Sequence, residues 1–387
     1  MKTYFKKYAK YFDYPLFFTY VLLCVFGLVM IYSASMFWAV HKLQTTPDFF
    51  YKKQLMNLTF AAFAFLIGFI IPYKRYKDRK MMMLIIATMI ILLMSVYLFG
   101  YSPDNSGAKS WLNFGFANLQ PSELTKLGMI LYFAAFFAKK RETGKLDIIN
   151  ESIMPPLLVF GAAILFIGLE PDLGAIGLIT MIVLSVMAAS GMRFTTFSKI
   201  VGCLIGLAGV GLIGLFIFKD SFFTVKRMGR LQAYLDPFKD SDVFGYQIVN
   251  GYYAIGSGGV KGLGLGQSVQ KMGYLPEPQT DFILAIISEE LGTFGVAIVL
   301  FGLGYIVYKA MRIAIKAKDP LARMIAAGIG SWIGIQTFVN VGGLSGIIPL
   351  TGVPLPFISY GGTSVILLSL AMGILANVSR IVKKENG

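Results

Sequence analysis

Apolar segments of membrane-spanning length recur from one end of the chain to the other. A helix of about 20 apolar residues crosses the hydrocarbon core of a bilayer, and these segments are of about that length. Ten such ranges can be read along the sequence: 15–37, 54–72, 81–99, 122–138, 153–169, 173–191, 200–218, 281–308, 323–344 and 363–379. We therefore expect an all-α, polytopic integral membrane protein with about ten transmembrane helices, folded as a single domain over residues 1–387.

Composition supports a membrane protein and excludes several other classes. Of the 387 residues, 56% are hydrophobic and only 14% are charged, which no ordinary soluble domain matches. The net charge of +15 is best explained by topogenic charge beside anionic lipid, so we expect a lipid bilayer and no nucleic acid as a partner. Cys24 and Cys203 lie in apolar segments and His41 is the single histidine, which argues against disulfides, zinc and a His-based triad.

The positive charges alternate between successive connections. One set of connections and tails carries 23 Lys and Arg residues, whereas the short connections of the other set carry four. Because cytoplasmic loops are enriched in Lys and Arg, this asymmetry predicts that both termini are cytoplasmic. The long segment 219–280 is then extracytoplasmic, together with loops 100–121 and 345–362.

With this topology, 13 of the 20 carboxylates lie outside the cell or near the outer ends of the helices. Carboxylates are costly to place near lipid and usually face a cavity, a partner or a substrate. An enzyme at the outer face has no cytosolic nucleotide, so its activated substrate must arrive already carrying its energy.

The most informative of these carboxylates is Asp281, in the sequence YLPEPQTDFILAIISEELG that begins at Tyr274. The pattern predicts Asp281 at the mouth of a long apolar helix, with Ala285, Ser288 and Gly292 near the same helical face. That small or polar face would admit another helix or a lipid headgroup. We expect Asp281 to take part in chemistry.

Other polar residues are candidates with two interpretations each. Glu123 and Lys126 are three residues apart, so they either pair at a helix start or contact substrate. Trp111 is either an interfacial anchor or a substrate contact, and Ser359 either packs or lines a cavity in a loop rich in Gly and Pro. The glycine-rich sequence 256–266 is either a flexible or re-entrant loop or faces a pyrophosphate. Cations of the outer segment that suit a phosphorylated headgroup are Lys226, Arg227, Arg230, Lys239, Lys261 and Lys271.

Four sequences in the same order make the chain resemble the SEDS family of shape, elongation, division and sporulation proteins, which polymerise the glycan strands of bacterial peptidoglycan. They are QPSELTK from Gln120, PDLG from Pro171, YLPEPQTDFI from Tyr274 and PLPFISYGG from Pro354. The third of them is more similar to the FtsW and SpoVE branch than to the RodA branch, and FtsW is the member that we expect the chain to be most like.

The resemblance implies that Asp281 is the catalytic aspartate and that Glu123 and Lys126 shape the cavity around it. Further substrate-binding candidates are Trp111, Arg227, Glu277, Thr280 and Ser359. The chain departs from many members at Ser110, where Arg is usual before the tryptophan, and at Glu170, where Gln is usual.

The resemblance also implies that lipid II, a disaccharide-peptide on undecaprenyl pyrophosphate, is the substrate. Asp281 would act as general base on the acceptor hydroxyl, and cationic side chains or a divalent cation (Mg²⁺ or Mn²⁺) would stabilise the pyrophosphate. We expect a class B penicillin-binding protein and other division proteins as partners, and the division septum of the cell membrane as the location. The alternatives are a flippase for lipid II and a non-catalytic scaffold of the division machinery.

Overall fold

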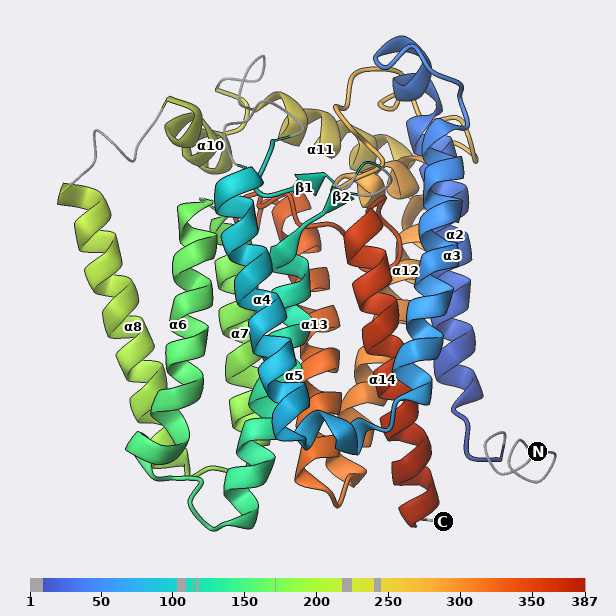
Figure 1. Cartoon of the computed structure of the whole chain (residues 1–387). Coiled ribbons are helices and arrows are strands. Elements are labelled where there is room, and N and C mark those ends of the chain that lie inside the picture. Colours follow the sequence, from blue (N-terminus) through green and yellow to red (C-terminus); the bar gives the residue numbers. More distant parts are fainter. Residues whose placement is uncertain are drawn as a thin grey trace.

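The computed structural model describes residues 10–102, 109–113, 115, 118–170, 172–217, 225–239 and 245–386. Within these residues the fold is a bundle of long helices that run roughly side by side (Figure 1). The long helices are α2 (Tyr14–His41), α3 (Phe49–Ile70), α4 (Arg79–Phe99), α5 (Pro121–Glu142), α6 (Met154–Leu169), α7 (Leu173–Ala189), α8 (Phe194–Ile217), α12 (Ile283–Lys316), α13 (Pro320–Leu344) and α14 (Gly362–Asn386). Shorter elements are η1 (Tyr73–Lys77), η2 (Ile149–Ile153), α10 (Val225–Leu235), α11 (Tyr246–Gly258) and the hairpin of β1 (Leu112–Asn113) and β2 (Asn118–Leu119).

The expected multi-pass helical fold is confirmed, because each predicted range coincides with one of these long helices. Seven helices of the described residues are long and apolar enough to cross a membrane. The helices alternate in direction, so α2 begins and α14 ends at the same end of the bundle (Figure 1). The number of helices that cross a bilayer and the side on which the termini lie stay predictions.

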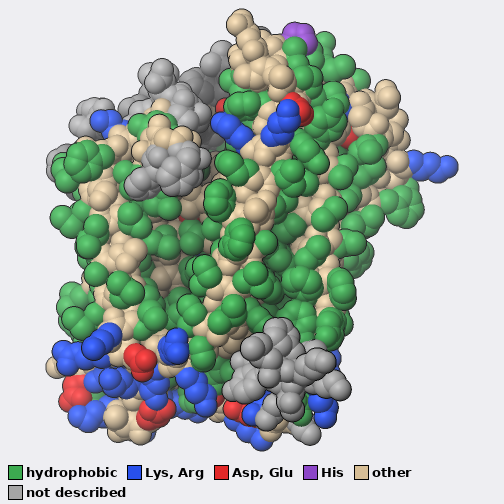
Figure 2. Space-filling view, turned by 45° about the vertical axis from the view of Figure 1, so that its right-hand side comes forward, with side chains coloured by type: hydrophobic (Ala, Val, Ile, Leu, Met, Phe, Trp, Pro, Cys, Tyr) green, Lys and Arg blue, Asp and Glu red, His purple; other side chains and the backbone are tan. Residues whose placement is uncertain are grey.

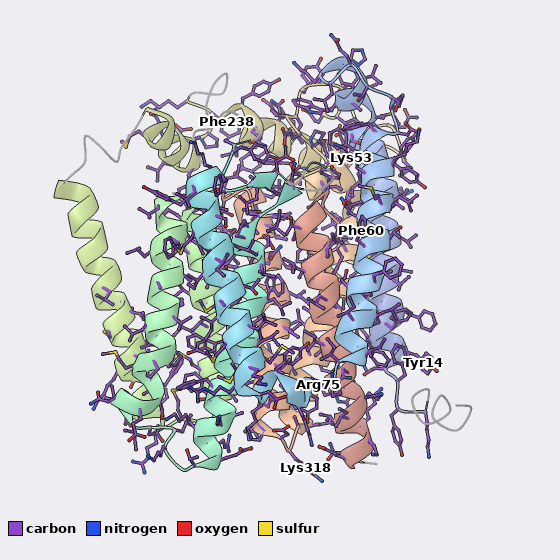
Figure 3. The ribbon with its side chains drawn as sticks, in the orientation of Figure 1. Tyr14, Lys53, Phe60, Arg75, Phe238 and Lys318 are labelled. Carbon is purple, nitrogen blue, oxygen red and sulfur yellow. The ribbon has the colours of Figure 1, made fainter. Side chains whose placement is uncertain are left out.

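The two ends of the bundle differ in charge. Hydrophobic side chains cover the middle of the surface, and Lys and Arg gather at the end where α2 begins (Figure 2). Arg75 and Lys318 lie at this end, whereas Lys53 and Phe238 lie at the opposite one (Figure 3). We call the first the basic end and the second the Asp281 end. A basic band beside an apolar belt is what the positive-inside rule predicts for a cytoplasmic face.

Helix α13 lies at the centre of the bundle and packs against α5, α7 and α12, while α14 packs along α3. The large side chain of Trp332 on α13 is completely buried. The start of α13 is fixed by two local features: Pro320 is in its first turn, and the carboxylate of Asp319 accepts a hydrogen bond from the backbone N–H of Leu321 (3.0 Å). Both are typical of a helix N-terminus, because they satisfy or remove N–H groups that have no helical partner.

The glycine-rich sequence 256–266 is held in place by hydrogen bonds, while re-entry into the membrane and contact with a pyrophosphate stay predictions. It completes α11 and then bonds to α12, with the N–H groups of Leu263 and Gly264 donating to the carbonyls of Glu289 and Glu290 (both 2.9 Å). Helix α12 is kinked where it meets this loop, at Gly292 (φ 65°, ψ −161°). A Cβ at Gly292 would clash with the loop backbone, so only glycine fits there.

Candidate active site

Asp281 lies on the turn that leads into α12, two residues before the helix begins. The prediction that it shares a helical face with Ala285, Ser288 and Gly292 is therefore wrong, because the helix starts later than its apolar pattern suggests. The side chain is half-buried, and the hydroxyl of Thr280 donates a hydrogen bond to Oδ1 (3.0 Å). The carboxylate thus stays accessible at the N-terminal end of a helix whose first residues are buried.

The loop after α13 places a glycine beside this carboxylate. Gly352 has φ +69°, and a Cβ built on it would lie 3.9 Å from Oδ2 of Asp281. The left-handed backbone and the missing side chain together leave room next to the carboxylate. The same loop reaches α7, because a Cβ on Gly174 would lie 3.3 Å from Cβ of Thr351.

A row of polar side chains on α13 connects Asp281 to the interior of the bundle. Asn340 donates from Nδ2 to the main-chain oxygens of Asp281 (2.9 Å) and Val353 (2.8 Å). Gln336, one turn earlier, donates from Nε2 to the main-chain oxygen of Pro354 (2.9 Å). Trp332, one further turn back, donates from Nε1 to Oε1 of Gln336 (2.7 Å). We call Trp332, Gln336 and Asn340 the α13 polar row.

The α13 polar row ends on the predicted pair of Glu123 and Lys126. Both side chains are buried, and Nζ of Lys126 lies 2.7 Å from Oε1 of Glu123 and 3.2 Å from Oε1 of Gln336. The pair interpretation is therefore correct for these two residues. Oε2 of Glu123 is buried and has no hydrogen-bond partner among the described residues. A polar atom left in this state is costly, so the pair also offers an acceptor to a ligand or a water molecule.

Two further carboxylates lie at the turn between α6 and α7, and one of them, Asp172, is close enough to Glu123 and Lys126 to interact with their charges. Asp172 caps α7 by accepting from the N–H of Ala175 (2.9 Å), and burial raises the pKa of Asp172. Burial also raises the pKa of Glu170 to about 8, and the charge of Asp172 adds to this shift. Glu170 is therefore a carboxyl that stays largely protonated near neutral pH.

The remaining predicted residues make contacts of other kinds. Trp111 is half-buried and its backbone pairs with Tyr101. The hydroxyl of Ser359 is buried and accepts from the N–H of Leu355 (2.8 Å). Glu277 is exposed on the turn before Thr280, with φ +42°, and the side chain of Arg227 on α10 lies outside the described residues. Contact of these residues with substrate stays a prediction.

The acidic residues inside α12 hold the glycine-rich segment in place. Glu289 accepts hydrogen bonds from the hydroxyl of Ser268 and the N–H of Val269. Glu290 accepts from Nζ of Lys271 (2.6 Å) and from the hydroxyl of Ser33 (2.7 Å). The prediction that Lys271 contacts a phosphorylated headgroup is therefore wrong, because its side chain is buried and paired.

Among the described residues, no three His, Cys, Asp or Glu side chains converge on a point where a metal ion could sit. The described side chains thus do not form a protein cage for Mg²⁺ or Mn²⁺, which prefer several oxygen ligands. Participation of a divalent cation in the reaction stays a prediction.

The sequence analysis missed the α13 polar row. Gln336 and Asn340 are four residues apart in an apolar span, so they share a helical face. This spacing is the feature of the sequence from which the row could have been predicted. A polar pair at that spacing in a membrane helix points to a cavity or a partner.

Comparison with known proteins agrees with this architecture. Residues 14–384 match the sequence profile of the FtsW/RodA/SpoVE family, described as cell cycle proteins. The chain is 43% identical over 382 residues to the probable peptidoglycan glycosyltransferase FtsW of Bacillus subtilis, covering 98% of this chain and 93% of that relative. It is 37% identical to the stage V sporulation protein E of the same organism, covering 93% and 94%.

Solved structures share the fold. One chain of a peptidoglycan synthase complex superposes with a TM-score of 0.75 at 22% identity, covering 96% of this chain and 98% of that one. The rod shape determining protein RodA of Thermus thermophilus superposes with a TM-score of 0.66 at 23% identity, covering 95% and 97%. The profile match over nearly the whole chain and the identity to curated relatives lead to one conclusion: the protein belongs to the FtsW/RodA/SpoVE family of cell cycle proteins.

Proposed function

We propose that the protein is a peptidoglycan glycosyltransferase that polymerises lipid II into glycan strands at the outer face of the bacterial cell membrane during division. The observation that carries this proposal is the position of Asp281. Its carboxylate is half-buried and lies beside a glycine that leaves room next to it, and its backbone is held by Asn340 of the α13 polar row. The name of the similar Bacillus subtilis protein, a probable peptidoglycan glycosyltransferase, supports the reaction class.

In the proposed reaction, the carboxylate of Asp281 accepts the proton of the acceptor sugar hydroxyl. The hydroxyl oxygen then forms a bond to the anomeric carbon of the donor, and the bond from that carbon to the pyrophosphate oxygen breaks. Undecaprenyl pyrophosphate leaves with the electron pair of the broken bond. Because pyrophosphate is a good leaving group once its charge is stabilised, the site has less need of a dedicated acid.

The α13 polar row supplies positioning in this mechanism. Asn340 bonds the backbone of Asp281 and of Val353, so it holds the base and the loop after α13 at a set separation. Glu123 and Lys126 form the floor of the site through Gln336. A general base is effective only within hydrogen-bond reach of the proton that it takes, so this placement matters more than the presence of a carboxylate alone.

Cations of the outer segment remain candidates for the leaving group. Lys239 and Lys261 are exposed, and Arg227 is carried on α10. We further propose a class B penicillin-binding protein as the partner, supported by the likeness to a chain of a peptidoglycan synthase complex. Location at the division septum, and contact with other division proteins, belong to the same proposal.

The experiment uses the purified full chain with its transpeptidase partner and lipid II. Asp281→Asn keeps the shape of the side chain and removes its basicity, so polymer should fall by at least about 100-fold, the lower range for general base catalysis. Asp236→Asn, in the same outer segment but away from α12, is the matched control and should polymerise normally.

Three results would contradict the proposal. Normal polymer from a folded Asp281→Asn protein would show that Asp281 is not the general base. Lipid translocation by wild-type protein without any polymer would favour a carrier, and normal division in cells that contain only Asp281→Asn would favour a scaffold.

A further inference from the structure

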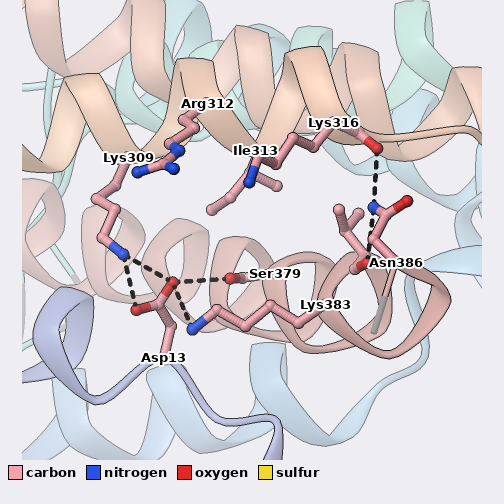
Figure 4. Close-up of a pocket in the computed structure, with 9 residues that line it drawn as sticks. Asp13, Lys309, Arg312, Ile313, Lys316, Ser379, Lys383 and Asn386 are labelled. Carbon is pink, nitrogen blue, oxygen red and sulfur yellow. Dashed lines mark hydrogen bonds and ion pairs between the residues drawn. The ribbon is translucent and has the colours of Figure 1, made fainter.

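A pocket of about 360 Å³ opens at the basic end, on the opposite side of the bundle from Asp281 (Figure 4). The C-terminal turns of α12 and α14 and the residue before α2 form its walls. Its lining includes Asp13, Lys309, Arg312, Lys316, Lys383 and Asn386. We call it the basic pocket, because four of these six side chains are cationic.

The single carboxylate among the described residues that line the basic pocket is already satisfied. Asp13 is 2% exposed and accepts from Lys309 (3.2 Å), Lys383 (3.1 Å) and the hydroxyl of Ser379 (3.0 Å). Burial would raise the pKa of Asp13, but hydrogen bonds and charges from Lys383 and Lys309 outweigh burial and lower it. Asp13 therefore stays ionised and cancels one of the four positive charges.

Arg312 and Lys316 supply two of the three positive charges that remain. Within the described part of the chain neither forms an ion pair with a carboxylate, and both side chains are exposed at the pocket. The two side chains are one helical turn apart on α12, which puts an arginine fork and a lysine ammonium on the same wall.

Two exposed side chains of α12 that lie outside the pocket lining indicate how deep in the membrane the pocket lies. Ile315 is 83% exposed and Tyr308 is 55% exposed, and the hydroxyl of Tyr308 accepts from Nη1 of Arg312 (3.4 Å). An exposed isoleucine beside a tyrosine with a polar contact is typical of the membrane interface, where headgroup phosphates lie. A pocket open at this depth can be reached both by lipid phosphate and by soluble phosphate.

We propose that the basic pocket binds a phosphate group at the membrane face opposite the glycosyl-transfer site. Arg312 provides paired N–H donors for two phosphate oxygens, and Lys316 provides a second charge. Lys309 and Lys383 stay attached to Asp13, so they shape the pocket, and the three side chains together keep one net positive charge. The phosphate belongs either to an anionic lipid or to a soluble anion, and both present the same oxygens.

The test measures phosphate binding to the full chain in detergent by native mass spectrometry. The lipid probe is phosphatidic acid with phosphatidylcholine as the neutral reference, and the soluble probe is inorganic phosphate. The variant Arg312→Gln/Lys316→Gln removes the two charges. Lys74→Gln/Arg75→Gln removes one lysine and one arginine from the same end but outside the pocket, and both residues are exposed.

In this proposal Arg312 and Lys316 each donate charge-assisted hydrogen bonds to the phosphate, so the pocket variant should bind at least about 30-fold more weakly. The matched variant loses only the diffuse, salt-screened attraction of two exposed charges outside the pocket, so its loss should be clearly smaller than that of the pocket variant. If inorganic phosphate displaces phosphatidic acid, a soluble phosphate is enough to occupy the pocket. If phosphatidic acid stays bound in the presence of inorganic phosphate, the ligand is a lipid.

Equal losses in the two variants would overturn the proposal, because binding would then be a property of the whole basic end. The proposal would also be overturned if the wild-type protein bound neither phosphatidic acid nor inorganic phosphate. Polymerisation of lipid II serves as a folding control and should be unchanged in both variants.

Discussion

Asn340 donates a hydrogen bond of 2.9 Å to the main-chain oxygen of Asp281, and a second of 2.8 Å to that of Val353. One amide on the central helix thus joins the turn before α12 to the loop after α13. The contact acts on the main-chain oxygen of Asp281 and does not use its carboxylate. The hydrogen bond from Asn340 therefore positions the proposed base without occupying the lone pairs of its carboxylate oxygens.

Replacing Asn340 with Leu should lower polymerisation by roughly 10- to 100-fold, because a base displaced by about 1 Å loses that much rate. Binding of lipid II should change much less than turnover. Thr337→Ala is the matched control, since among the described residues that hydroxyl bonds just the carbonyl of Ile333 in its own helix (2.7 Å). Steady-state kinetics and thermal unfolding check both variants, and full activity in a folded Asn340→Leu protein would argue against positioning.

Replacing Gly352 with Ala should reduce activity far more than stability. The φ of +69° costs alanine roughly 1 kcal/mol, and the new methyl group would lie next to Oδ2 of Asp281. Gly144→Ala separates the two effects: it has the same φ of +69° and nothing within 4 Å of its Cβ. Equal loss of polymerisation in both variants would mean that crowding of Asp281 plays no part.

The pair of Glu123 and Lys126 predicts a strong non-additive effect on stability. Lys126→Met alone leaves a buried carboxylate without its cation, which should destabilise the fold by about 3–5 kcal/mol. The double variant Glu123→Gln/Lys126→Met removes both charges and should recover much of this loss. A double-mutant cycle of unfolding free energies in detergent measures the coupling. Additive losses would show that the two side chains do not depend on each other.

Lys271 should behave as a structural residue and Lys261 as a surface residue. Lys271→Ala leaves Glu290 buried without its ion pair and should lower the unfolding free energy by about 3–5 kcal/mol. Lys261→Ala, an exposed side chain in the same segment, should fold normally. Thermal unfolding distinguishes them, and a stable Lys271→Ala protein with a raised KM for lipid II would restore Lys271 as a headgroup contact.

Glu170 makes stability depend on pH. Its pKa is raised from 4.5 to about 8 in the fold, so the folded state holds the proton more tightly than the unfolded state. The contribution to stability is fully present below about pH 4.5 and is lost as pH rises through about 8. Glu170→Gln should therefore reduce the decline of Tm between pH 5 and about 8 and raise Tm at pH 8 by a few degrees. An unchanged slope would contradict a buried, protonated carboxyl.

Local pattern was enough to predict the helices. The apolar segments matched α2 to α8 and α12 to α14, because a chain in lipid must satisfy its backbone internally and a helix does so segment by segment. The exact start of α12 was not predictable in this way. Phe282 and Ile283 continue the apolar run, and only the turn geometry places Asp281 before the helix.

The pairing of Glu123 with Lys126 was also visible as a three-residue spacing on one helix. The contacts of Lys271 and Glu290 with Ser33 could not be predicted from spacing, because Ser33 lies on α2, far away along the chain. A cation in a glycine-rich outer segment looks free in the sequence. Only its neighbours in space decide whether it is exposed or buried.

The sequence by itself determined the membrane-embedded class of the protein, its helices and the residue types that chemistry requires, since hydropathy and spacing are local properties. The tertiary structure alone decided which polar groups meet. Asn340, Gln336 and Lys126 form a connected set only because α5 and α13 pack together and the loop after α13 folds back on them. Contacts between distant segments depend on packing, and packing is a property of the whole chain.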